Sequence, residues 1–100
     1  MSKKIAITLA DSAIGDLQDI LFFYEEQQIP HVGKRLVAKT IVDIELLAEQ
    51  PDMGRIVPEF DLPFLRELIR PPFRIVYRRD GNKIRIVRIW RSERLMVLPP

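Results

Sequence analysis

Residues 65–94 read LRELIRPPFRIVYRRDGNKIRIVRIWRSER, and this stretch decides the fold that the sequence predicts. Apolar residues alternate with arginine through it, which is typical of β-strands. The expected strands cover residues 64–70, 73–78 and 83–91. Pro71-Pro72 provides the first turn, and Asp80-Gly81 between two alternating runs is a strong hairpin signal. We therefore expect a three-strand antiparallel meander.

Charge is distributed unevenly between the two parts of the chain. Residues 65–100 hold ten Lys/Arg against three acids, whereas residues 1–64 hold six against eleven. The formal net charge of +2 therefore combines a part of charge +7 with a part of charge −5. Such asymmetry influences the choice of partner more than the fold.

Upstream of the meander the pattern changes from strand to helix. Residues 4–9 are predicted to form a strand, with Thr8 as the helix cap and Asp11 three residues on. Apolar residues then recur every three or four positions over residues 10–28 and again from Pro30 to Pro51, which predicts two amphipathic helices. The joint between them is short, so the helices form an antiparallel hairpin. Residues 51–63 are expected to be a loop.

The predicted class is therefore α+β: an N-terminal strand, an antiparallel helical hairpin and a three-strand antiparallel meander, forming one sheet packed on the helices. The 100 residues suffice for a single domain spanning residues 1–100. The chain has no cysteine and no apolar run long enough to cross a membrane, and its first residues do not resemble a signal peptide. We expect a cytoplasmic protein that needs no membrane, cofactor or metal.

The last predicted strand has apolar residues on both faces, and both then need cover. On strict alternation Ile84 and Ile86 share one face, and Val87 and Ile89 share the other. One helical hairpin covers one face, so we expect Val76 and one of these pairs to form an exposed apolar patch among arginines, which would mark an interaction site. The alternative is that Leu95–Pro100 folds back over this face.

Several single residues have a simple structural interpretation. Phe22 and Phe23 widen the apolar stripe of the first helix and are expected in the core or at its edge, with contact to a partner as the lesser alternative. Tyr24 and Tyr77 are expected to pack in the core, and His31 to be a solvated turn residue. Trp90 lies at a strand end between Ile89 and Arg91, which makes it a candidate interface anchor.

In its order of elements the chain resembles toxins of the ParE/RelE superfamily from bacterial type II toxin–antitoxin systems. The resemblance rests on residues 7–27 (ITLADSAIGDLQDILFFYEEQ), residues 46–55 (LLAEQPDMGR) and the meander quoted above. It is nearer to ParE, the plasmid stabilisation type. For ParE-type toxins it implies stabilisation of the cleaved-DNA complex of DNA gyrase, which blocks replication.

RelE-type toxins are instead ribosome-dependent mRNA endonucleases, and this activity is the alternative. It needs proton carriers as well as cations. Ribonuclease members usually have a histidine or tyrosine near the end of the last strand or in the tail, and residues 90–100 (WRSERLMVLPP) contain neither. Glu67 and Glu93 are possible bases but are more simply ion-pair partners of arginines. We therefore expect a gyrase inhibitor without catalytic residues rather than an enzyme.

The partner that the resemblance implies is a cognate antitoxin, whose C-terminal segment wraps the toxin and masks its arginines. Operator DNA would be contacted only through the antitoxin. The candidate residues for binding the target or the antitoxin are Arg70, Arg74, Val76, Arg78, Arg88, Trp90, Arg91 and Arg94. A non-toxic family member that binds nucleic acid or protein is a further alternative, although no RNA-binding motif is present.

Overall fold

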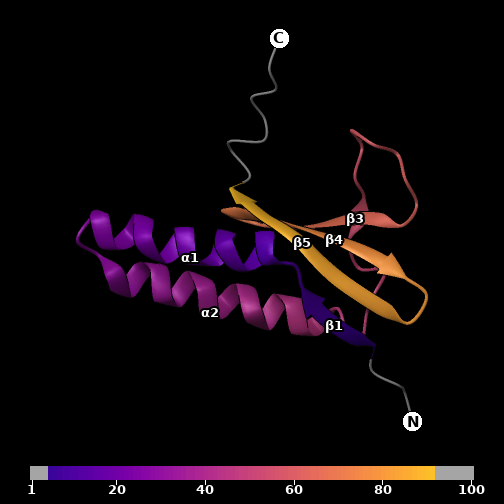
Figure 1. Ribbon diagram of the computed structural model, residues 1–100, viewed down its shortest axis with the longest axis horizontal. Helices are drawn as coiled ribbons and strands as arrows, with labels where there is room; N and C mark the ends of the chain where they lie inside the picture. Colours follow the sequence, from indigo (N-terminus) through magenta and orange to yellow (C-terminus); the bar gives the residue numbers. More distant parts are fainter. Residues whose placement is uncertain (1–4, 92–100) are drawn as a thin grey trace.

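The computed structural model describes residues 5–91 of the chain, and these form two helices and five strands (Figure 1). The elements are β1 (Ala6–Leu9), α1 (Asp11–Glu26), α2 (Pro30–Leu46), β2 (Arg55–Ile56), β3 (Leu65–Arg70), β4 (Phe73–Asp80) and β5 (Lys83–Arg91). Their order in the sheet is β1-β5-β4-β3-β2, with β1 parallel to β5 and every other pair antiparallel. The predicted α+β class and the meander are confirmed.

Two local predictions upstream of the meander are wrong. Thr8 lies inside β1, and α1 begins after Ala10, which makes no side-chain capping bond. The expected loop over residues 51–63 contains the short strand β2, which pairs with Arg66 and Glu67 of β3. Two residues are too few to produce a periodic pattern, so the sequence could not reveal this strand.

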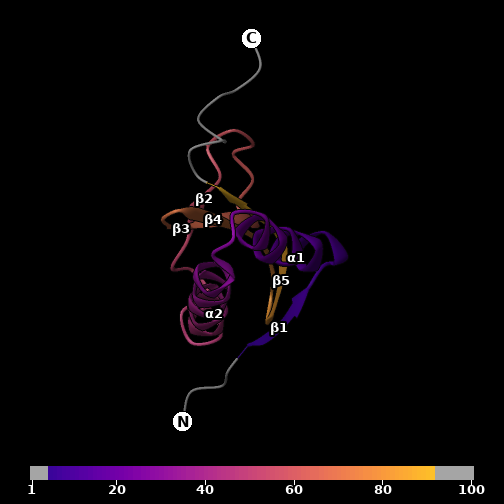
Figure 2. The same ribbon diagram turned by 90° about the vertical axis from the view of Figure 1, so that its left-hand side faces the viewer.

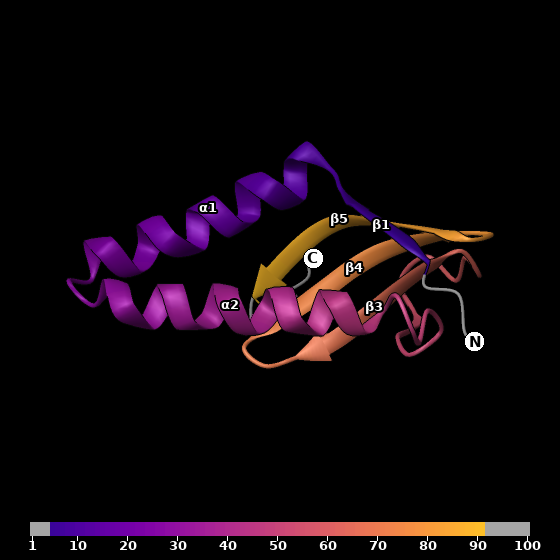
Figure 3. The same ribbon diagram turned by 90° about the horizontal axis from the view of Figure 1, so that it is seen from below.

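The helical hairpin lies on one face of the sheet (Figure 2), and its joint projects beyond the strands (Figure 3). Pro30 occupies the first turn of α2, as expected, where its missing N–H costs nothing. Gly33 lets the helices approach closely, since a Cβ there would lie 3.0 Å from the Tyr24 Cβ. The joint itself uses Gln28 at a φ of 65°.

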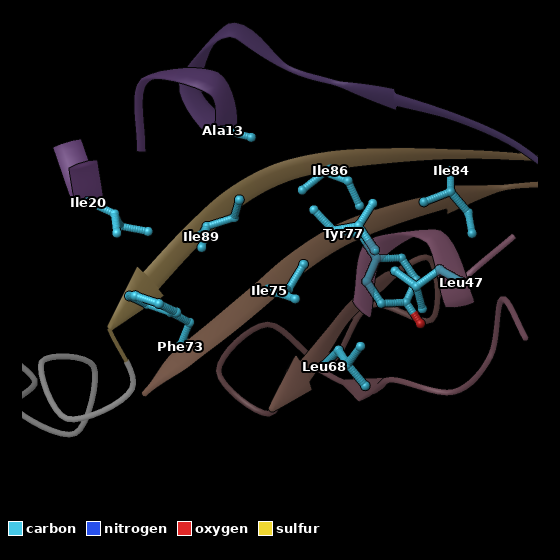
Figure 4. Packing of buried hydrophobic residues seen from close by; sticks show 11 residues of the cluster. Ala13, Ile20, Leu47, Leu68, Phe73, Ile75, Tyr77, Ile84, Ile86 and Ile89 are labelled. Carbon is cyan, nitrogen blue, oxygen red and sulfur yellow. The ribbon is translucent and has the colours of Figure 1, made fainter. Parts of the chain in front are cut away.

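The core lies between the hairpin and the central strands (Figure 4). Phe73, Ile75 and Tyr77 of β4 all point into it and are at most 2% exposed, as alternation predicts. Tyr77 is confirmed as a core residue. Across the sheet, Leu68 of β3 pairs with Ile75, so the apolar side chains of neighbouring strands stand in register. The cis peptide bond Pro71-Pro72 lies in the turn between β3 and β4.

In β5 strict alternation fails because of a register shift. Val76 pairs with Arg88 but the next residue, Tyr77, pairs with Ile86, which leaves Val87 as an extra residue. Such a bulge exchanges the two faces of a strand from that point on. Ile84, Ile86 and Ile89 are therefore all in the core, at most 3% exposed, and the expectation that they divide between two faces is wrong.

The far face of the sheet, away from the helices, is also closed at its centre. Val76 is 5% exposed, so its predicted place in an open apolar patch is wrong. On this face Glu67 is opposite Val76 in the neighbouring strand, and Arg74 is two residues before Val76 in β4. Both charged side chains are buried with it. The alternative cover, Leu95–Pro100, lies outside the described residues.

Candidate functional site

A groove lies between α1 and the end of β5. Its volume is about 850 Å³. It is lined by Asp16, Asp19, Ile20, Phe22, Phe23, Tyr24, Glu26, Phe73, Arg88, Ile89, Trp90 and Arg91. Three of the predicted binding residues, Arg88, Trp90 and Arg91, are therefore brought together here.

Two phenylalanines of α1 supply the apolar part of the groove. Phe22 is 62% exposed and Phe23 is 47% exposed, so the expectation that they lie in the core is wrong. The end of α1 extends past the strands, as Figure 3 shows, and both phenylalanines remain exposed there. Adjacent exposed aromatic rings of this kind mark interaction surfaces.

Arg88 is fixed to the helix by a buried carboxylate. Its Nε and Nη2 each donate to Asp16 at 2.9 Å, and the Ile89 backbone N–H donates to Asp16 at 2.8 Å. These hydrogen bonds raise the pKa of the Arg88 guanidinium above its ordinary value. The same guanidinium lies 5.0 Å from the centre of the Trp90 ring, so β5 and α1 are joined at the groove.

Arg91 makes the second contact between β5 and α1. Its Nη1 donates to the Tyr24 hydroxyl at 3.1 Å, and its guanidinium lies 5.6 Å from the Phe23 ring centre and 5.8 Å from that of Phe73. Phe23 and Tyr24 pack edge to face, with centroids 5.0 Å apart. Tyr24 is partly buried against the core, as expected. The groove thus combines aromatic rings with ordered guanidinium groups.

The other predicted binding residues lie elsewhere. Arg74 is 6% exposed and pairs with Glu67 and with Glu59, the latter at 3.0 Å. Arg70 lies 3.5 Å from Asp43 of α2, on the helix side of the sheet. Arg78 is exposed, pairs with Asp80 at 2.9 Å and stacks 4.6 Å from the Phe64 ring centre. Arg94, like Glu93, is outside the described residues.

Arg74 belongs to an ion-paired network on the far face that we call the far-face cluster: Arg55, Glu59, Glu67 and Arg74. The Glu67 side chain is fully buried and accepts bonds from Arg74 and, at 2.7 Å, from Arg55. The ion-pair interpretation of Glu67 is therefore confirmed. Hydrogen bonds from Arg74 lower the pKa of the Glu59 carboxyl below its ordinary 4.5.

Two residues whose side chains can carry a proton, Tyr77 and His31, are not among those that line the groove. The Tyr77 hydroxyl donates to the Pro51 carbonyl at 2.8 Å and accepts from the Gly54 N–H at 3.0 Å. Burial raises the pKa of the Tyr77 phenol. His31 is exposed at the start of α2. Within residues 5–91 no group of His, Cys, Asp and Glu could hold a metal ion, and no helix is long and apolar enough to cross a membrane.

Comparison with known proteins then decides the family. The protein-family model described as the ParE toxin of the type II toxin–antitoxin system parDE matches residues 7–96 of the chain. The chain belongs to the ParE toxin family. The family inferred from the sequence is thereby confirmed. No curated protein matches the chain.

Solved structures agree with this assignment. A chain described as the chromosomal ParDE system from P. aeruginosa is 26% identical, with a TM-score of 0.72, and the match covers 90% of this ParE-family chain and 98% of that one. A chain from the toxin–antitoxin complex RelBE2 of Mycobacterium tuberculosis is 19% identical, with a TM-score of 0.61 and coverage of 88% and 98%. The second likeness concerns the fold alone.

The sequence revealed the groove only in part. The basic residues of β5 were identified because arginine and tryptophan dominate interface energetics. Phe22, Phe23 and Asp16 were not among the predicted binding residues. For the two phenylalanines the reason is that a helical apolar stripe has the same sequence pattern whether it is buried or extends beyond the sheet.

Proposed function

We propose that this protein is the toxin of a type II toxin–antitoxin pair, that an antitoxin segment binds in the α1–β5 groove, and that the target is DNA gyrase. The observation that carries the antitoxin part is the exposure of Phe22 and Phe23 beside Arg88, Trp90 and Arg91. Membership of the ParE family and the likeness to a chain from a ParDE system support the same partner.

The groove suits an amphipathic segment with acidic residues. Its aromatic rings offer apolar anchors, and anchors of this type provide most of the binding energy in protein interfaces. Arg88 and Arg91 are held in place by Asp16 and Tyr24 before any partner arrives. Preorganised side chains lose little entropy on binding, so an acidic group reaching them would gain affinity.

Gyrase is favoured over messenger RNA by the state of the possible proton carriers. Glu67 is buried and bonded to two arginines, and the Tyr77 hydroxyl has both a donor and an acceptor partner inside the protein. Neither can take or give a proton at an RNA 2′-hydroxyl in this conformation. An inhibitor that acts by docking needs no such group.

The target is tested by expressing the chain alone in bacteria and assaying the purified protein on gyrase. We expect growth arrest with filamentation, DNA-damage signalling and trapped gyrase–DNA cleavage complexes. Rapid loss of translated messages without cleavage complexes would instead support the ribonuclease. Absence of any effect from a folded protein would indicate a non-toxic family member.

The antitoxin site is tested by Phe22→Ser. This side chain is already largely exposed, so the fold should be unaffected, whereas loss of one anchor should weaken antitoxin binding about 10- to 100-fold. Phe60→Ser is the matched control, because Phe60 is 59% exposed in the loop between β2 and β3, outside the groove. Isothermal titration with the antitoxin's C-terminal segment provides the measurement. Equal affinities of the two variants would place the antitoxin elsewhere.

A further inference from the structure

The sheet has an open edge at β1, and backbone geometry identifies the groups that face outward. The Ile5 N–H donates away from β5, to the Ala48 carbonyl at 3.0 Å, whereas the Ala10 N–H donates toward β5, to Ile86 at 2.8 Å. Backbone groups of successive strand residues point to opposite sides. The N–H and C=O of Ile7 therefore point to the open side, and within residues 5–91 they have no hydrogen-bond partner there.

An apolar groove adjoins this edge, at the end of α2. Its volume is about 490 Å³, and Ile5, Ile7, Val42 and Leu46 line it. Val42 is 55% exposed and Leu46 is 37% exposed. An extended segment placed along β1 would therefore gain apolar contacts with α2 as well as backbone hydrogen bonds.

Two carboxylates complete the groove. Glu45 and Glu49 line it, both are exposed, and no lysine or arginine of the described chain forms an ion pair with either. The α1–β5 groove carries charges of both signs, Arg88 and Arg91 with Asp16, Asp19 and Glu26, whereas the charged residues of this one are both acidic. The two surfaces therefore differ in the partner charge that they favour.

We propose that β1 and the end of α2 form a second docking site, which takes an extended segment of a partner protein whose apolar and basic side chains occupy every second position and so share one face. The segment adds a strand next to Ile7, its apolar side chains enter the groove, and its lysines or arginines meet Glu45 and Glu49. A second copy of this chain fits less well, because antiparallel pairing of two β1 strands would bring two acidic rims together. The site does not depend on the toxin's target.

The test uses the full chain and an acetylated octapeptide in which valine and lysine take turns at every second position and threonine fills the positions between, so that valine and lysine share one face. Binding is followed by NMR. We expect amide hydrogen exchange at Ile7 to slow at least tenfold at saturating peptide, while that at Thr8, which faces β5, does not change. Glu45→Lys should weaken binding about tenfold. Glu25→Lys is the matched control, an exposed glutamate in the last turn of α1, and should have no effect.

Four outcomes would overturn the proposal. These are no binding of the peptide, binding without protection at Ile7, equal weakening by Glu45→Lys and Glu25→Lys, and equal affinity for a peptide in which glutamate replaces lysine. Protection of Ile7 without peptide, together with a dimer in sedimentation, would assign the edge to a second copy instead. A peptide that is N-methylated at the amides facing β1 should lose binding, which separates strand addition from charge attraction alone.

Discussion

Arg74 and Arg91 come from the same alternating stretch, yet the protein uses them in different ways. Arg74 is buried in the far-face cluster between two glutamates. Arg91 is half-buried at the α1–β5 groove and contacts aromatic rings and a hydroxyl. The dense positive charge of the meander is thus partly structural and partly available to a partner. The two uses differ because the chain places the carboxylates of Glu59 and Glu67 beside Arg74, whereas it places aromatic side chains of α1 beside Arg91.

The far-face cluster should dominate stability. Glu67→Ala leaves Arg74 buried without its nearest carboxylate, and breaking a buried ion pair from one side costs about 3–5 kcal/mol. Urea denaturation monitored by Trp90 fluorescence would measure the loss. Glu49→Ala, at an exposed position, should change the free energy of unfolding by less than about 0.5 kcal/mol. Similar losses for both variants would mean that the cluster is not structural.

Gly54 supports the same cluster through the backbone. A Cβ at this position would lie 2.7 Å from the Glu67 carbonyl oxygen and from the Tyr77 hydroxyl, so Gly54→Ala should destabilise the protein by about 1–3 kcal/mol. Gly15→Ala is the control, since nothing lies within 4 Å of its added Cβ and alanine favours the helix by about 0.5–1 kcal/mol. Thermal unfolding should thus shift in opposite directions for the two.

At the groove the expected stability effect is smaller. Asp16→Asn removes the charge that Arg88 contacts but keeps an oxygen for the Ile89 N–H, and Arg88 is exposed enough to remain hydrated. We expect a loss of about 1 kcal/mol in unfolding free energy. Antitoxin affinity should fall further than stability, because Arg88 would no longer be held beside Trp90. An affinity unchanged by Asp16→Asn would separate the groove from the binding function.

The arrangement of elements was predictable because periodicity and turn chemistry are local. Phe73, Ile75 and Tyr77 lie on the face that alternation predicts, and the expected hairpin turn is present, with Gly81-Asn82 as its two loop residues between Asp80 and Lys83. The bulge at Val87 is not local, because it depends on how β5 pairs with β4. One extra residue was enough to bring Ile84, Ile86 and Ile89 to the same face and remove the predicted apolar patch.

The candidate site was predictable only where residue type alone carries information. Arginine and tryptophan at the end of β5 were candidates on chemistry, and the structure brings Arg88, Trp90 and Arg91 into one groove. Arg74 has the same chemistry. The sequence indicated Glu67 as an ion-pair partner of arginines, but not that Arg74 is buried between Glu67 and Glu59. The pairing with Glu59 depends on the path of the loop after β2, which the sequence does not reveal.

The smallest expected effect is a pH dependence at the outer part of the far-face cluster. Because hydrogen bonds from Arg74 lower the pKa of Glu59 below 4.5, the carboxylate stabilises the folded state above pH 4.5. This contribution is lost as the pH falls through the lowered folded-state pKa. At pH 7 Glu59→Gln should therefore be less stable than the parent by about 0.2–1 kcal/mol. The difference in unfolding free energy should shrink toward zero on acidification. A difference that stayed constant with pH would mean that Glu59 acts through packing rather than charge. The contrast between the buried Arg74 and Arg91 at the groove would then depend on the ion pair with Glu67 alone.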